Sequence, residues 1–119
     1  MGERDNEGEA IVMNYLKRKG QHPEKAEGYP GYDIKAGQKC IEVKSTNISV
    51  KDKHFFMLTE REYKAAMHNK EYWVYWVDLT KRKKIIAKIN REFIKKYSDP
   101  VLSYRLKVSA IKRILNIKQ

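Results

Sequence analysis

Residues 31–45 read GYDIKAGQKCIEVKS, an acid followed by a short turn and then by Glu-x-Lys within an apolar segment. Side chains alternate between the two faces of a β-strand. Glu42 and Lys44 are therefore expected on one face of a strand, and Ile41 and Val43 on the other. An acid and a base that share one face of a covered strand indicate a functional site.

The turn within this segment predicts which residues face each other. If Gly37-Gln38 is a two-residue turn, the hairpin pairs Ala36 with Lys39 and, further back, Asp33 with Glu42. Directly opposed cross-strand residues have Cβ atoms roughly 5 Å apart, a distance at which two uncompensated carboxylates repel each other. A divalent cation removes this conflict, and a ligand set made only of oxygen suits Mg²⁺ or Mn²⁺. The alternative is a solvated strand face with a surface ion pair.

Length and composition predict a single domain over residues 1–119. The chain has one cysteine, Cys40, and no Cys/His spacing typical of zinc sites. It has no segment of about 20 apolar residues that could cross a bilayer. We therefore expect a cytoplasmic protein with no membrane segment.

The net charge of +11 is distributed unevenly. Residues 1–80 contain equal numbers of basic and acidic residues, so the excess lies in residues 81–119, where Glu92 and Asp99 are the acids. Segregated basic charge is typical of nucleic-acid binding, although Lys-rich surfaces also occur in thermophile proteins. The predicted nucleic-acid-binding residues are Lys51, Lys53, Lys81, Arg82, Lys83, Lys84, Arg105, Lys107, Lys112 and Arg113.

Helical spacing predicts two helices in the first two thirds of the chain. In residues 6–19, one stripe carries Val12 and Leu16 together with an acid, Glu9. Residues 21–31, rich in Gly and Pro, are expected to form a loop, and a loop is also expected from residue 45 to 54. A capping box, with Thr59 at N-cap and Glu62 at N3, predicts a helix over 60–69. Its buried residues are expected to be Tyr63, Ala66 and Met67.

The remaining elements are predicted from alternation and caps. Residues 72–77, YWVYWV, favour β structure on both faces and indicate an interior strand. A strand over 83–89 and a helix over 91–97 capped by Asn90 follow. We expect a half-buried strand over 103–108 and a final helix capped by Ser109.

This order of elements resembles the PD-(D/E)xK nuclease superfamily, whose members have the restriction-endonuclease-like fold. More narrowly, the chain resembles the family of the protein NO VEIN C-terminal domain over roughly residues 7–78. The resemblance rests on four spaced motifs followed by a strand. They are Gly8-Glu9-x-x-Val12, Gly31-Tyr32-Asp33-Ile34, Ile41-Glu42-Val43-Lys44 and Leu58-Thr59-x-x-Glu62, with Tyr72-Trp73-Val74-Tyr75 after them.

The resemblance implies an α/β (α+β) fold with a mixed central sheet flanked by helices. It implies that Asp33 and Glu42 bind Mg²⁺ with the carbonyl of Val43, that Glu9 completes the acidic site, and that Lys44 orients and activates water or stabilises charge. The implied activity is Mg²⁺-dependent hydrolysis of DNA by an endonuclease. The alternatives are a Holliday-junction or branched-DNA resolvase and a catalytically silent nucleic-acid-binding module.

The partner of such a protein would be DNA, with RNA as an alternative because phosphate contacts do not distinguish the sugars. Cutting both strands of a duplex at one place would require two sites, and hence a homodimer with two-fold symmetry.

Overall fold

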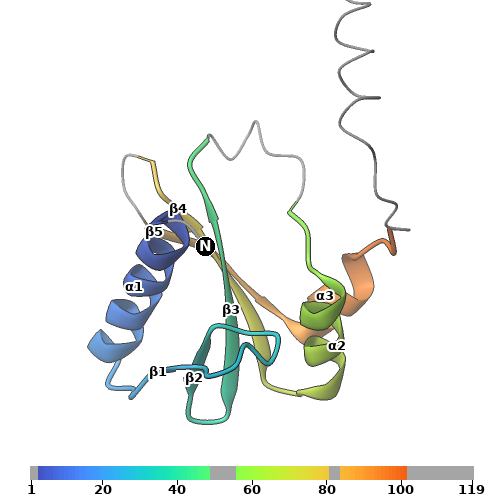
Figure 1. The fold of residues 1–119 in the computed structure, drawn as a ribbon, viewed down its shortest axis with the longest axis horizontal. Helices are drawn as coiled ribbons and strands as arrows, with labels where there is room; N and C mark the ends of the chain where they lie inside the picture. The colour runs from blue at the N-terminus through green and yellow to red at the C-terminus, as the bar shows by residue number, and fades with distance from the viewer. Residues whose placement is uncertain (1–2, 49–55, 81–83, 102–119) are drawn as a thin grey trace, which may run out of the picture.

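The computed structural model describes residues 3–48, 56–80 and 84–101, which form a mixed sheet and three helices (Figure 1). The sheet has five strands in the order β1-β2-β3-β4-β5. The strands are β1 (Glu24–Lys25), β2 (Ile34–Ala36), β3 (Lys39–Thr46), β4 (Tyr72–Asp78) and β5 (Lys84–Asn90). The helices are α1 (Glu3–Arg18), α2 (Glu60–His68) and α3 (Arg91–Tyr97). The expected mixed sheet flanked by helices is confirmed.

The hairpin between β2 and β3 has the register that its turn predicts. Ala36 pairs with Lys39 and Ile34 with Ile41, and Gly37 has a φ of +60°, a left-handed conformation that favours glycine. The register therefore brings Asp33, one residue before β2, beside the middle of β3. The expected loop over 21–31 contains the two-residue β1, which pairs with β2.

Strand β4 lies between β3 and β5, as the unbroken aromatic and β-branched run predicts. It runs parallel to β3 and antiparallel to β5, and α2 makes the crossover between the parallel strands. The loop expected from residue 45 was wrong at its start, because Ser45 and Thr46 continue β3 and pair with Val77 and Asp78.

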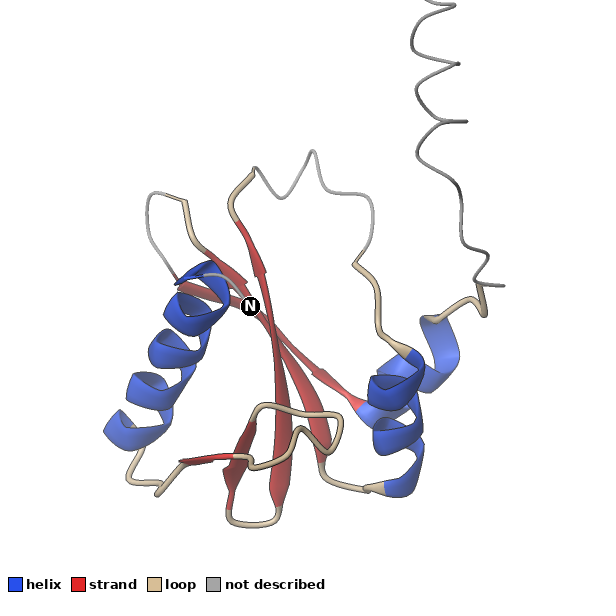
Figure 2. Cartoon of the chain, viewed as in Figure 1, coloured by secondary structure: helices blue, strands red, loops and turns tan. Residues whose placement is uncertain are grey.

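Helices cover both faces of the sheet (Figure 2). Helix α1 lies on one face, where its Val12 and Leu16 pack with Ile41 and Val77. On the other face α2 and α3 form a second cluster, whose buried residues are Cys40, Ala65, Ala66, Tyr72, Val74 and Ile94. The alternation within β3 is thus confirmed, and it leaves Glu42 and Lys44 on the face of α2.

Helix α2 begins at the predicted capping box. The Thr59 side chain accepts a hydrogen bond from the Glu62 backbone, and the Glu62 side chain accepts one from the Thr59 backbone. The predicted buried stripe was wrong at Tyr63, which is 38% exposed, but Ala66 is buried as predicted and Met67 is half-buried against the second cluster. Glu62 and Ala65 are buried as well. The helix is rotated so that its acid, rather than its tyrosine, faces β3.

Asn90 caps α3 by accepting from the backbone N–H of Phe93, as predicted. The strand expected over 103–108 and the helix expected from Ser109 lie outside the described residues. Within the described ranges, none of the helices is both long and apolar enough to cross a membrane.

Candidate active site

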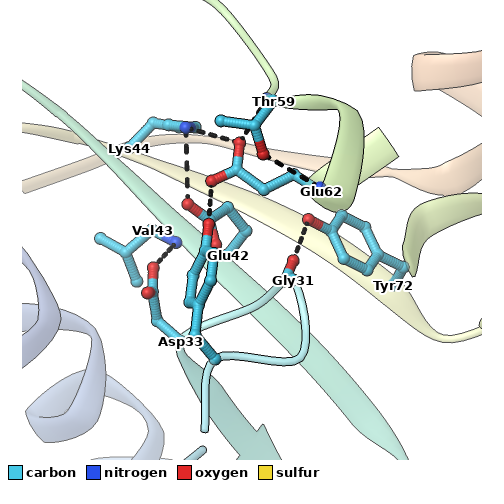
Figure 3. A network of polar contacts seen from close by, with 9 residues as sticks. Gly31, Asp33, Glu42, Val43, Lys44, Thr59, Glu62 and Tyr72 are labelled. Atoms are coloured by element: carbon cyan, nitrogen blue, oxygen red, sulfur yellow. Dashed lines mark hydrogen bonds and ion pairs between the residues drawn. The ribbon is translucent and has the colours of Figure 1, made fainter. Parts of the chain in front are cut away.

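The site is built on the middle of β3, where the neighbouring chain segment brings in an acid. The backbone N–H of Val43 donates to Asp33 Oδ2 at 2.8 Å (Figure 3). Within a strand, the N–H and C=O of one residue point to the same side. The carbonyl of Val43 therefore points toward the edge at which Asp33 lies, as a ligand role would require.

Lys44 lies between two carboxylates. Its Nζ is 3.5 Å from Glu42 Oε2 and 2.9 Å from Glu62 Oε1 (Figure 3). Both acids are largely shielded, with side chains 5% and 4% exposed. The structure thus brings together Asp33, Glu42 and Lys44, and adds an acid from the first turn of α2.

Glu62 is the residue that sequence reasoning missed as part of the site. The capping box accounts for it as a helix-terminal residue, and the same Oε1 that accepts from Lys44 also accepts from the Thr59 backbone at 2.8 Å. The signal that could have identified it was its presence in the spaced motif Leu58-Thr59-x-x-Glu62. A cap residue that is also part of a motif can serve both the helix and a site.

The loop before Asp33 contacts both β4 and α2. The hydroxyl of Tyr72 donates to the carbonyl of Gly31 at 2.9 Å, and Arg61 Nη1 donates to the carbonyl of Tyr29 at 3.4 Å. Gly31 has a φ of +98°, and a Cβ there would lie 2.7 Å from Ala65 Cβ. Only glycine fits this close approach without a shift. The loop also directs the hydroxyl of Tyr29 to Glu62 Oε2.

Burial and like charge favour the protonated forms of the two predicted ligands. Burial, with the charges of Asp33 and Glu62 adding to it, raises the pKa of Glu42 to about 10. Burial also raises the pKa of Asp33, an effect that the Val43 N–H partly opposes. The site therefore places more carboxyl groups together than its single ammonium can balance as carboxylates.

For Lys44 and Glu62, neighbouring groups outweigh burial and favour the charged forms. Burial alone would lower the pKa of Lys44, but the carboxylates of Glu62 and Glu42 outweigh it and the pKa is raised. Burial alone would raise the pKa of Glu62, yet hydrogen bonds from Lys44, Tyr29 and Thr59 lower it. Lys44 is thus an ammonium and Glu62 a carboxylate.

The residues present fit a hard divalent cation. Glu42 Oε1 is buried, and no donor among the described residues reaches it. The nearby groups are carboxyl and carbonyl oxygens, the ligands that Mg²⁺ and Mn²⁺ prefer. No three His, Cys, Asp or Glu side chains of the described residues form a ready cation cluster. Mg²⁺ usually takes only one or two carboxylates and keeps several waters.

The other predicted site residues remain predictions. Glu9 is buried on α1, where its Oε1 lies 3.7 Å from Lys25 Nζ, and its role as a metal ligand is not tested. Of the predicted nucleic-acid-binding residues, Lys84 is exposed at the start of β5. The others lie outside the described residues: Lys51, Lys53, Lys81, Arg82, Lys83, Arg105, Lys107, Lys112 and Arg113.

The fold and the site together define a mixed α+β protein with a buried carboxylate–lysine centre on its third strand. The family model described as Protein NO VEIN, C-terminal, matches residues 8–89, and the chain belongs to this family. That range contains all four motifs and every member of the described centre. No curated protein and no solved structure matches the chain.

Proposed function

We propose that the protein is a Mg²⁺-dependent endonuclease of the PD-(D/E)xK superfamily that hydrolyses phosphodiester bonds of DNA. The observation that supports this most directly is the pair of carboxyl groups, the buried Glu42 and the half-buried Asp33, beside a lysine that is held as an ammonium. Buried acids with raised pKa values next to a specific charge partner are concentrated at active sites.

Asp33, Glu42 and the carbonyl of Val43 would hold the metal, Mg²⁺ or Mn²⁺. A bound divalent ion lowers the pKa of water and neutralises negative charge on the scissile phosphate. Glu9 would add a further oxygen, directly or through a water. The chain itself thus contributes a rigid set of oxygens on the edge of β3.

Lys44 contributes charge rather than proton abstraction. Two neighbouring carboxylates keep it protonated, so its Nζ is a hydrogen-bond donor and not a base. A preorganised ammonium stabilises charge that develops on the phosphate oxygens in the transition state. It also orients the attacking water by donating to it.

The charge of the chain supports a polyanionic substrate. The excess of +11 lies in residues 81–119. Neutralising phosphates with Lys and Arg releases counterions and gives affinity without sequence information. This term is independent of the metal, so DNA binding and cleavage can be measured separately.

The experiment is a nuclease assay on supercoiled plasmid, linear duplex, single-stranded DNA, a four-way junction and RNA, each with Mg²⁺ and with EDTA. The proposal predicts Mg²⁺-dependent nicking of DNA and gel-shift binding of DNA in EDTA. Cleavage confined to the junction would identify a resolvase. Binding without cleavage of any substrate would contradict the proposed activity and leave a binding module.

A further inference from the structure

The three carboxylates of the site differ in how many hydrogen-bond donors they already have. Glu62 accepts from three: Lys44 and the Thr59 backbone at Oε1, and Tyr29 at Oε2. Asp33 accepts from the Val43 backbone at Oδ2, and Glu42 keeps a buried oxygen without a donor among the described residues. A carboxylate offers about four lone-pair sites. Glu62 is therefore the acid whose capacity is most fully used within the protein.

This difference separates the roles of the acids. An oxygen that already accepts two hydrogen bonds would have to break them to bind a cation. Breaking the bonds to Glu62 would release Lys44 and open the first turn of α2. Glu42 Oε1, in contrast, can bind a cation with no such loss.

We infer that Glu62 is a positioning residue that holds the Lys44 ammonium beside the two acids Asp33 and Glu42. Tyr29 supports Glu62 by donating a hydrogen bond to it. The inference rests on the proposed function for its kinetic consequence but on the contacts themselves for the geometry. Glu62 is set by the capping box on one side and by the Tyr29 loop on the other. Both supports come from elements outside β3, so the ammonium is positioned by α2 and the loop together.

The backbone conformation of Tyr29 is unusual and directs its side chain to Glu62. It has a φ of +46°, the positive value that a bulky residue rarely adopts, between Gly28 at +72° and Gly31 at +98°. Such strain persists only where the surroundings fix it, and it is concentrated at functional sites. Two contacts with α2 fix this loop conformation: the hydrogen bond from Arg61 to the Tyr29 carbonyl and the close approach of Gly31 to Ala65.

The kinetic test is a double-mutant cycle of Glu62→Gln with Lys44→Ala, measured by single-turnover plasmid nicking with enzyme in excess. Glu62→Gln retains the shape and an acceptor oxygen but removes the charge. If Glu62 acts through Lys44, Glu62→Gln should slow cleavage at least tenfold in the wild-type background and less than twofold in the Lys44→Ala background. The Mg²⁺ concentration at half-maximal rate should change less than threefold.

Two companion variants sharpen the result. Tyr29→Phe should slow cleavage by a smaller factor, because one of the three donors to Glu62 is lost. Glu60→Gln is the matched control: it lies in the same helical turn, is exposed, and pairs with Lys64. It should change the rate less than twofold. Equal losses from Glu62→Gln in both backgrounds, or no loss in either, would overturn the inference.

A second measurement does not depend on nuclease activity. Acylation of lysines by an N-hydroxysuccinimide ester in EDTA, read residue by residue by mass spectrometry, reports how firmly each ammonium is held. Glu62→Gln should accelerate labelling of Lys44 at least threefold relative to Lys70, and Glu60→Gln should not. Unchanged Lys44 labelling would overturn the inference even if the rate falls. Wild-type protein without cleavage would defeat the proposed function, and the labelling alone would then decide this inference.

Discussion

The backbone N–H of Val43 donates to the carboxylate of Asp33 across 2.8 Å. This bond ties the last residue of a Gly- and Pro-rich loop to the middle of the strand that carries Glu42 and Lys44. Because the bond is made by the backbone of β3, substitution of the Val43 side chain does not remove it. Asp33 therefore depends for its position on the path of its own loop.

That dependence can be tested at Gly31. Gly31→Ala would place a Cβ 2.7 Å from Ala65 Cβ and 2.8 Å from the Arg61 carbonyl, at a positive φ. Left-handed backbone and overpacking together should cost roughly 2–4 kcal/mol of unfolding free energy. Urea unfolding followed by tryptophan fluorescence measures it. We also expect cleavage to fall, because Asp33 lies two residues further on.

Gly37→Ala is the matched control. Gly37 also has a positive φ, but a Cβ at this position would have no neighbouring atom within 4 Å. The substitution should cost only about 1 kcal/mol, the conformational part of the effect. Equal losses for the two variants would show that Gly31 is not packed tightly against α2.

The raised pKa of Glu42 predicts how stability changes with pH in the absence of metal. The unfolded chain releases this proton near pH 4.5, whereas the folded protein keeps it to about pH 10. The unfolded state therefore binds fewer protons between these values, and stability should fall as the pH rises through this window. Glu42→Gln should flatten the fall, as measured by urea unfolding in EDTA from pH 5 to pH 9. A slope that is the same in wild type and Glu42→Gln would contradict the assignment.

Metal binding should reverse this loss. A cation bound to the folded state alone stabilises by about 2.7 kcal/mol at a hundred times its Kd. Mg²⁺ and Mn²⁺ should thus raise the melting temperature of the wild type, and Asp33→Ala and Glu42→Ala should abolish the increase. An increase that persists in both variants would place the cation elsewhere.

Lys44→Ala separates the ammonium from the metal. Loss of one preorganised charge donor should reduce kcat by about 10²–10³-fold. The Mg²⁺ concentration at half-maximal rate should change little, because Lys44 is not a ligand. A loss that disappears at high Mg²⁺ or high DNA concentration would show instead that Lys44 serves binding.

The source of DNA affinity is tested by charge reversal in two clusters. One variant changes Lys81, Arg82, Lys83 and Lys84 to Glu, and the other changes Arg105, Lys107, Lys112 and Arg113. Each lost phosphate contact should reduce the slope of log K against log salt by about 0.9. We expect the first cluster to lose both affinity and slope in EDTA, because the sequence predicts a basic turn between two strands there, and such a turn can reach a groove. Unchanged slopes in both variants would show that the charge serves another purpose.

Local patterns predicted most of the fold. The Gly37-Gln38 turn predicted the register of the hairpin, the capping box predicted the start of α2, and the run over 72–77 predicted the central strand. Each of these signals is carried by residues close together in sequence. The predicted inward face of α2 was right at Ala66 but wrong at Tyr63, because a hydrophobic stripe assigns this tyrosine inward and takes no account of a buried acid. Its inward face depends on Lys44, 18 residues away from Glu62.

For the candidate site, the sequence predicted the proximity of the residues that lie on or beside the β2–β3 hairpin. Asp33, Glu42 and Lys44 follow from turn and alternation alone. Tyr29 could not be predicted, because its loop has no periodicity and its position depends on contacts with Arg61 and, through Gly31, with Tyr72. Long-range polar contacts of this kind leave no regular spacing in a sequence.

The central claim, that Asp33 and Glu42 form a metal-dependent phosphodiesterase site, is tested most directly by plasmid nicking. Wild type, Asp33→Ala, Glu42→Ala and the exposed control Glu71→Gln should be compared with Mg²⁺, with gel-shift binding measured in EDTA. The account predicts nicking by wild type and the control, and at least a hundredfold loss in both site variants. It also predicts DNA binding in EDTA as strong as wild type or slightly stronger, because the substitutions remove no group that binds phosphate and can only reduce the negative charge that repels it. Mg²⁺-dependent nicking retained by both site variants would contradict it.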